Sequence, residues 1–139
     1  MKPQLTLAPL PVLPPRPAPT FAVRRSSEIL SYHELTLEDD QGGYAHWVIP
    51  QPLKQLSKRP VLLWLLSTAP LLGPLSCVES GHLQLAPARP GTATNLRTEL
   101  ENGVLRLNFD GQLLRGYYRL QCLPTGCGQL WQFTPIGHI

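Results

Sequence analysis

Glu34 and His46 are the two side chains whose chemistry is easiest to connect to a function. A carboxylate oxygen and an imidazole nitrogen are suitable ligands for manganese or zinc, provided that both residues lie on paired strands and face the same way. Two protein ligands alone make a weak metal site, and His82 is a candidate third ligand. The simpler interpretation is a surface carboxylate and a solvent-facing histidine, as most isolated residues of these types are.

Six basic residues are candidates for contacts with phosphate groups. Two of them, Arg115 and Arg119, are four residues apart on one predicted strand, so they should share a face. Lys and Arg number only 12 against 9 Asp and Glu, so attraction to nucleic acid depends on local clustering. Dispersed charge that keeps the chain in solution is the alternative. The six candidates are Arg24, Arg25, Lys58, Arg59, Arg115 and Arg119.

Three tryptophans and a tyrosine pair offer flat surfaces on which nucleic-acid bases could stack. Aromatic residues within alternating strands more often fill the core, so we interpret all of them as core residues. They are Trp47, Trp64, Trp131 and the pair Tyr117-Tyr118.

The three cysteines, Cys77, Cys122 and Cys127, have spacings that fit no zinc signature. We expect reduced, partly buried thiols, because an intracellular domain normally keeps its thiols reduced. A disulfide between Cys122 and Cys127, across a turn at Pro124-Thr125-Gly126, stays open as an alternative.

From Phe21 onward, short apolar and polar alternations are interrupted by glycine and proline, which is typical of an all-β domain. Asp39 to Gly43 and Asp110-Gly111 indicate hairpins, hence antiparallel neighbours. The sequence predicts a small closed or nearly closed antiparallel β-barrel of about eight strands, because closure removes exposed strand edges. One or two short helical turns are expected within residues 53–57 and 95–101. The predicted strands are residues 20–24, 30–38, 44–49, 61–66, 82–85, 104–109, 113–120 and 129–134.

Residues 1–20 differ from the rest of the chain, because they hold seven of its 16 prolines and no acidic residue. Proline lacks an amide donor and fixes φ, which predicts a disordered, extended arm that could dock in the aromatic groove of a protein partner. Residues 21–139 form the predicted barrel domain. No signal peptide is recognisable, and the apolar residues 61–75 are too short and interrupted to span a membrane, so we expect a cytoplasmic protein.

Four parts of the chain share the order and spacing of one known family. The first is Phe21-Ala22-Val23 with Leu37-Glu38, and the second is the strand His46-Trp47-Val48-Ile49-Pro50. The third is a hairpin that runs from Gly103 through Gly111 to Leu120, and the fourth is Trp131. In these features the chain resembles the 3′-phosphoesterase domain of bacterial DNA ligase D.

The resemblance implies a β-barrel whose concave face binds manganese and a DNA 3′ end, and which removes a 3′-phosphate or terminal ribonucleoside during DNA repair. Aligned without gaps, Glu34 stands at the family's metal-binding aspartate. Ser26 and Tyr32 stand at two histidines, and Thr36 stands at an arginine. A third metal histidine is missing from residues 66–70. Most of the residues that the family's chemistry needs are therefore replaced.

The preferred hypothesis is a pseudoenzyme that keeps the barrel, has lost or reduced catalysis, and binds nucleic-acid ends or proteins. One alternative is an active manganese-dependent 3′-phosphoesterase with a rearranged site, in which Glu34 acts with His33 or His46. His33 should face away from Glu34 unless a β-bulge turns it back. The other alternative is a scaffold that recruits a partner through its proline-rich arm. The cofactor is manganese under the second hypothesis and none is required under the others.

Overall fold

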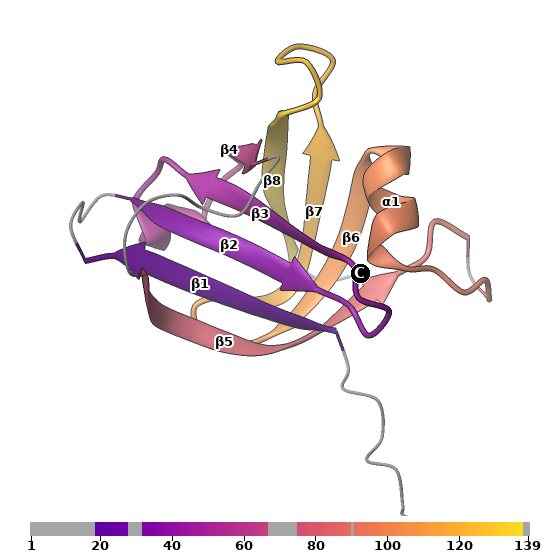
Figure 1. Cartoon of the computed structure of the whole chain (residues 1–139), viewed down its shortest axis with the longest axis horizontal. Coiled ribbons are helices and arrows are strands. Elements are labelled where there is room, and N and C mark those ends of the chain that lie inside the picture. The colour runs from indigo at the N-terminus through magenta and orange to yellow at the C-terminus, as the bar shows by residue number, and fades with distance from the viewer. Residues whose placement is uncertain (1–18, 28–31, 67–74, 90, 138–139) are drawn as a thin grey trace, which may run out of the picture.

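Eight strands and one short helix make up the computed structural model (Figure 1), which describes residues 19–27, 32–66, 75–89 and 91–137. Except for Pro19 and Thr20, the predicted proline-rich arm lies outside the described residues. Residues 67–70, part of the segment that lacks the family's third histidine, also lie outside them. In chain order the elements are β1 (Thr20–Ser26), β2 (His33–Glu38), β3 (Tyr44–Ile49), the 3-10 turn η1 (Leu53–Gln55), β4 (Val61–Leu66), β5 (Leu75–Ala86), α1 (Leu96–Asn102), β6 (Val104–Asp110), β7 (Arg115–Cys122) and β8 (Leu130–Gly137).

The strands close into an antiparallel barrel in the order β1-β2-β3-β4-β8-β7-β6-β5, which confirms the predicted fold class. Sequential hairpins build each half, and two pairings, β4 with β8 and β5 with β1, join the halves. The predicted turn between β2 and β3 closes through a bond from the Asp39 N–H to the Gly43 carbonyl at 2.9 Å. Gly42 takes a φ of 84° there, a conformation that favours glycine.

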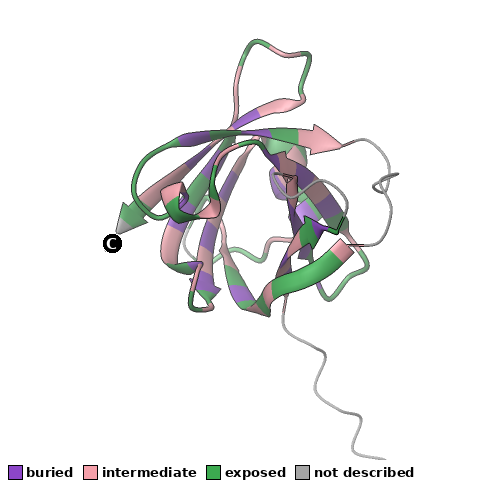
Figure 2. Cartoon of the chain, turned by 90° about the vertical axis from the view of Figure 1, so that its left-hand side faces the viewer, coloured by how far each residue is buried: buried purple, intermediate pink, exposed green. Residues whose placement is uncertain are grey.

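The core lies inside the barrel, because apolar side chains alternate along the strands and point inward. Figure 2 shows the buried positions as bands that alternate with exposed ones along the strands. Trp47 and Trp131 are fully buried and meet edge to face, with ring centroids 5.8 Å apart. Tyr118 is buried beside Phe133, whereas Tyr117 is half-buried. The prediction of core positions is therefore right for Trp47, Trp131 and Tyr118.

Trp64 corrects that prediction, because its side chain is 41% exposed on the outer face of β4. Val61 and Leu63 point inward on this strand, so the residues between them point outward. An unbroken apolar run does not show which residues face the core, and this is why the sequence could not separate Trp64 from its neighbours.

Two further expectations are right only in part: residues 82–85 are in a strand and Cys122 is partly buried, but the rest differs. The strand predicted at residues 82–85 is the end of β5, which begins at Leu75. Its first half pairs with β1, and Ser76, Cys77 and Val78 are exposed there, so the apolar alternation that marks a half-buried strand is missing. Cys77 and Cys127 are exposed rather than partly buried, and the described structure contains all three cysteines as free thiols.

The α-helix of the described residues, α1, contacts β6, and Asp39 binds its first turn to the end of β2 (Figure 1). Asn95 accepts a bond from the Thr98 N–H at 2.8 Å, and Asp39 Oδ2 accepts from the Leu96 N–H at 2.9 Å. Gly103 ends the helix with a φ of 83°. Among the described residues, neither α1 nor any other helix has the length and apolar character needed to cross a membrane.

Candidate functional site

Strand register brings the candidate residues of β1, β2 and β3 together on the outer face of the barrel. Arg24 pairs with Glu34, Glu34 pairs with Val48, and Val48 pairs with Trp64 of β4, so these four residues form one row across four strands. Thr36 and His46 are paired in the next row. Leu35 and Leu37 point into the core, so Glu34 and Thr36, which alternate with them along β2, point to the opposite face.

Five side chains form a polar cluster on this face, namely Arg24, Tyr32, Glu34, Thr36 and His46. Tyr32 Oη donates to Glu34 Oε2 at 2.8 Å. Arg24 Nη1 donates to Thr36 Oγ1 at 3.0 Å, and Thr36 Oγ1 lies 2.9 Å from His46 Nδ1. The cluster is therefore two hydrogen-bonded groups, Tyr32 with Glu34 and Arg24 with Thr36 and His46.

Two polar atoms of the cluster are buried and find no hydrogen-bond partner among the described residues. Glu34 is 0% exposed, and its Oε1 accepts no bond from any described residue. His46 Nε2 is in the same situation. An unpaired buried polar atom costs free energy, so such atoms point to a ligand or to a function that tolerates the cost.

Burial lowers the pKa of His46 below its usual value; the carboxylate of Glu34 opposes this shift, and the guanidinium of Arg24 adds to it. The imidazole is therefore neutral at pH 7. Its tautomer decides what Nε2 can do, because Nδ1 either donates to Thr36 or accepts from it. If Nδ1 carries the proton, Nε2 offers a lone pair; if Thr36 donates to Nδ1, Nε2 carries the proton.

Burial also raises the pKa of Tyr32, and the hydrogen bond to Glu34 and the charge of Glu34 raise it further. The phenol therefore stays protonated at physiological pH. It acts as a fixed donor to Glu34 rather than as an acid or base.

The cluster fits a catalytic metal ion poorly. Glu34 Oε1 and His46 Nε2 are two suitable ligand atoms, but metal sites in proteins usually have three or more protein ligands. Arg24 adds a positive charge beside them, which disfavours a second cation. Within the residues that the structure describes, no group of three or more His, Cys, Asp or Glu side chains is placed to bind a metal.

The other two described histidines, His33 and His82, lie elsewhere. His33 pairs with Arg25 and with Ile49 in regular registers, so it occupies the face of β2 opposite to Glu34. No bulge of the kind that would turn it back is found where β2 meets β1 and β3, both of which are described in full. His82 is exposed on β5, paired with Thr20, two rows away from Glu34.

A shallow groove of about 350 Å³ adjoins the polar cluster on the outer face of β5, β1 and β2. Arg24 and Thr36 belong to both the cluster and the groove, and His82 and Glu38 lie toward its far end. Arg24 is the only Lys or Arg among the residues that line the groove.

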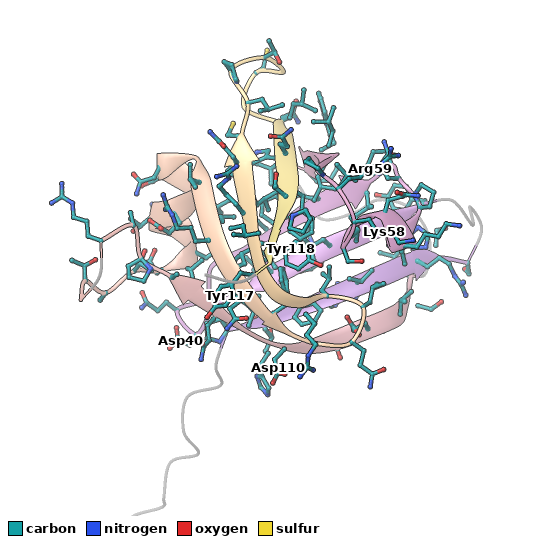
Figure 3. All side chains as sticks on the ribbon, turned by 180° about the vertical axis from the view of Figure 1, so that it is seen from behind. Asp40, Lys58, Arg59, Asp110, Tyr117 and Tyr118 are labelled. Carbon is teal, nitrogen blue, oxygen red and sulfur yellow. The ribbon has the colours of Figure 1, made fainter. Side chains whose placement is uncertain are left out.

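Four exposed basic residues gather at one end of the barrel, which we call the cationic end. Arg25 lies near the end of β1 and pairs with His33 of β2. His33 pairs in turn with Ile49, the last residue of β3, so Arg25 and Ile49 lie at the same end of the barrel. The connection from β3 to β4 then supplies the other three. Figure 3 shows Lys58 and Arg59 together at this end. The members are Arg25, Lys54, Lys58 and Arg59.

The exposed carboxylates of the described residues lie away from the cationic end. Two belong to the β2–β3 turn region, one to α1 and one to the β6–β7 hairpin, and Figure 3 shows Asp40 and Asp110 far from Lys58 and Arg59. One end of the described surface therefore carries four exposed cations and no exposed carboxylate, whereas the carboxylates share the rest of the surface with four exposed arginines, Arg89, Arg97, Arg115 and Arg119. These carboxylates are Glu38, Asp40, Glu101 and Asp110.

Arg115 and Arg119 are not part of the cationic end. Both are exposed on β7, in the other half of the barrel, where Arg115 is paired with Asp110 and Arg119 with Arg106. Of the six basic candidates, Arg25, Lys58 and Arg59 therefore lie at the cationic end, and Arg24 lies in the polar cluster. Arg115 and Arg119 form a separate pair on β7.

Sequence reasoning missed three features of the site. It treated Tyr32 and Thr36 only as replacements, although both are hydrogen-bonded to the candidate residues. The spacing of Tyr32, Glu34 and Thr36 on one strand was the signal that could have found them, because alternate residues share a face. Lys54 is the second feature, and a residue in a connection between strands gives no such signal. The exposure of Trp64 is the third, and it depends on the register of β4.

No protein-family model matches the chain, and no curated protein matches it in sequence. The assignment of the site therefore depends on the contacts and charges described above.

Proposed function

We propose that this barrel is a nucleic-acid-end binding module, similar to the ligase D phosphoesterase domain, in which phosphoester cleavage is lost or strongly reduced. The observation that carries the proposal is the cationic end, which adjoins the polar cluster and its groove. The ligand is a DNA 3′ end that carries a phosphate, and the setting is DNA repair in the cytoplasm.

The charge distribution supports binding of a polyanion. Four exposed cations with no exposed described carboxylate among them attract phosphates, and each phosphate contact releases counterions from the DNA. Arg24, in the groove beside the cationic end, can bind a terminal phosphate through guanidinium donors beyond the one that Thr36 accepts.

The residues of the polar cluster support the loss of catalysis. Phosphoryl transfer requires charge neutralisation at the reacting phosphate by metal ions or several cationic groups. The cluster offers one arginine and two atoms suited to a metal, where the resembling family has further histidines and another arginine. Binding without turnover is what such a reduced set can perform.

Binding of a fluorescent duplex with a 3′-phosphate, measured by anisotropy over a salt series, tests the proposal. The double variant Lys58→Ala/Arg59→Ala should weaken binding and reduce the slope of log K against log salt by about 0.7–0.9 for each lost contact. The matched control is Arg115→Ala/Arg119→Ala, which removes the same charge from the other half of the barrel. Equal effects of the two doubles, or no salt-dependent binding by the wild type, would contradict the proposal.

A second candidate function, a manganese-dependent 3′-phosphoesterase, is favoured by the two unpaired atoms Glu34 Oε1 and His46 Nε2. They would hold the metal, which would polarise the phosphate. Release of labelled phosphate from a 3′-phosphorylated primer–template with manganese, abolished in Glu34→Ala, would establish this function in place of the first. Absence of release with DNA binding intact would eliminate it.

Residues 1–20 are proposed to recruit a protein partner through their proline-rich sequence. Deleting them should abolish capture of that partner and leave DNA binding by the barrel unchanged.

A further inference from the structure

The outer face of β4 carries two large apolar side chains in contact with solvent. Leu62 and Trp64 are each 41% exposed, and they alternate with the buried Val61 and Leu63. A tryptophan is usually much more buried than this, because its ring is the largest apolar surface that a side chain can offer. An exposed indole on a regular strand is therefore a candidate contact for a flat ligand.

Trp64 lies beside both parts of the proposed site. It continues the row that runs from Arg24 through Glu34 and Val48, so three strand spacings of about 4.8 Å separate it from Arg24. In the other direction, β4 begins two residues after Arg59. The indole therefore lies in the same row as Arg24 and Glu34 of the polar cluster, on the strand that follows the loop with Lys58 and Arg59.

The combination of an exposed aromatic ring and nearby cations is the arrangement that proteins use to bind single-stranded nucleic acid. Bases stack on the ring whatever their sequence, while the cations follow the phosphates. An apolar protein surface would also cover Leu62 and Trp64, but it would leave the four neighbouring cations without partners. The charge therefore favours a nucleic acid as the occupant.

We infer that Trp64 stacks on an unpaired base next to the phosphates that the cationic end holds. The inference rests on the proposed function and makes it narrower, since the preferred ligand becomes a 3′ end with unpaired nucleotides rather than a blunt duplex. A paired base in a blunt end is stacked on its neighbours and cannot present its face to the indole.

The test compares two 3′-phosphorylated DNA ligands, a blunt duplex and the same duplex with an unpaired 3′ oligothymidine extension, by anisotropy at fixed salt. Trp64→Ala should weaken binding of the extended ligand about 5- to 150-fold, which corresponds to one stacked base, and should leave the blunt ligand unaffected. Trp64→Phe should retain most of the affinity. The control is Leu62→Ala, which removes an equally exposed aliphatic side chain from the same face and should have little effect.

Trp64 emission gives a second measurement that does not depend on the alanine variant. Trp47 and Trp131 are buried, so binding of the extended ligand should quench the part of the emission that is absent from Trp64→Phe. The slope of log K against log salt should be the same in Trp64→Ala and the wild type, because no phosphate contact is lost.

Different results would overturn the role of Trp64 and the proposed function. Salt-dependent binding that is equally strong for both ligands, with no effect of Trp64→Ala, would overturn the role of Trp64 and leave the proposed function standing. Loss of affinity for both ligands to the same extent in Trp64→Ala would also overturn the role of Trp64. No binding of either ligand by the wild type would overturn the proposed function itself. A protein partner that covers Trp64 would then be the remaining explanation for its exposure.

Discussion

Glu79 stabilises the barrel by holding the β6–β7 hairpin. Its Oε1 accepts hydrogen bonds from the Gln112 and Leu113 N–H groups, both at 2.8 Å, and its Oε2 accepts from the Leu114 N–H at 2.9 Å. Gly111 lies so close that a Cβ there would be 2.7 Å from Glu79 Oε2. One carboxylate on β5 therefore fixes the whole turn.

Glu79→Gln should lower the free energy of unfolding by about 2 kcal/mol. Hydrogen bonds to a charged acceptor contribute about 1.5–3 kcal/mol each, and the amide directs its own N–H groups at one or more of the backbone donors. The partial exposure of Glu79 keeps the loss below the sum of three bonds, because water replaces part of it. Urea unfolding at pH 7 with an unchanged m-value measures this loss.

The pH dependence gives the same prediction a second test. Burial raises the pKa of Glu79, but the three backbone N–H groups outweigh burial and hold the pKa below its usual value. A carboxyl group with a lowered folded-state pKa stabilises the fold above its unfolded-state pKa, about 4.3, and this contribution disappears as pH falls through the folded-state pKa. The difference in stability between the wild type and Glu79→Gln should therefore be constant above about pH 5 and shrink in acid.

The matched control is Glu101→Gln, which removes an exposed carboxylate whose contact with Arg97 is 4.0 Å long. That variant should change stability by less than about 0.5 kcal/mol. If Glu79→Gln were as small in effect, or if its effect did not change in acid, the carboxylate would not be holding the hairpin.

Three further changes have effects that urea unfolding can measure. Tyr32→Phe removes the only hydrogen bond to the buried Glu34 carboxyl group among the described residues, so it should cost about 1–3 kcal/mol; a stability equal to wild type would mean that other groups solvate Glu34. Asp39→Ala leaves three backbone N–H groups without an acceptor and should cost about 2–3 kcal/mol, which an unchanged midpoint would disprove. Trp131→Ala opens a cavity in the core and should cost about 3–5 kcal/mol, whereas a loss below 1 kcal/mol would contradict its core position.

The fold could be predicted from the sequence because its signals are local. The bounds of β3 and β4 agree with the predicted residues 44–49 and 61–66, where apolar residues are dense and prolines mark the ends. The helix also follows from local signals, since Asn95 caps it and Gly103 ends it. β5 was underestimated because its first half has no apolar alternation, and pairing with β1 rather than composition makes it a strand.

The candidate site was harder to predict because it depends on register between strands. Alternation within β2 predicts that Glu34 and Thr36 share a face, but it does not predict which residues of β1 and β3 lie opposite them. Pairing alone brings Arg24 to Glu34 and His46 to Thr36. The burial of Glu34 and the exposure of Trp64 reverse what their residue types suggest, and both occur in one row of the sheet.

Thr36 is the residue on which the choice between a binding module and an enzyme depends. Its hydroxyl has one proton and two acceptor lone pairs, and one lone pair accepts from Arg24. If the hydroxyl proton goes to His46 Nδ1, His46 Nε2 carries a proton and cannot bind a metal; if Nδ1 donates instead, Nε2 is available beside Glu34. A threonine between an arginine and a histidine therefore allows both states, and in either of them the positive charge of Arg24 opposes a metal ion at Nε2. The same positive charge attracts a phosphate, so the geometry that weakens a metal site strengthens an anion site.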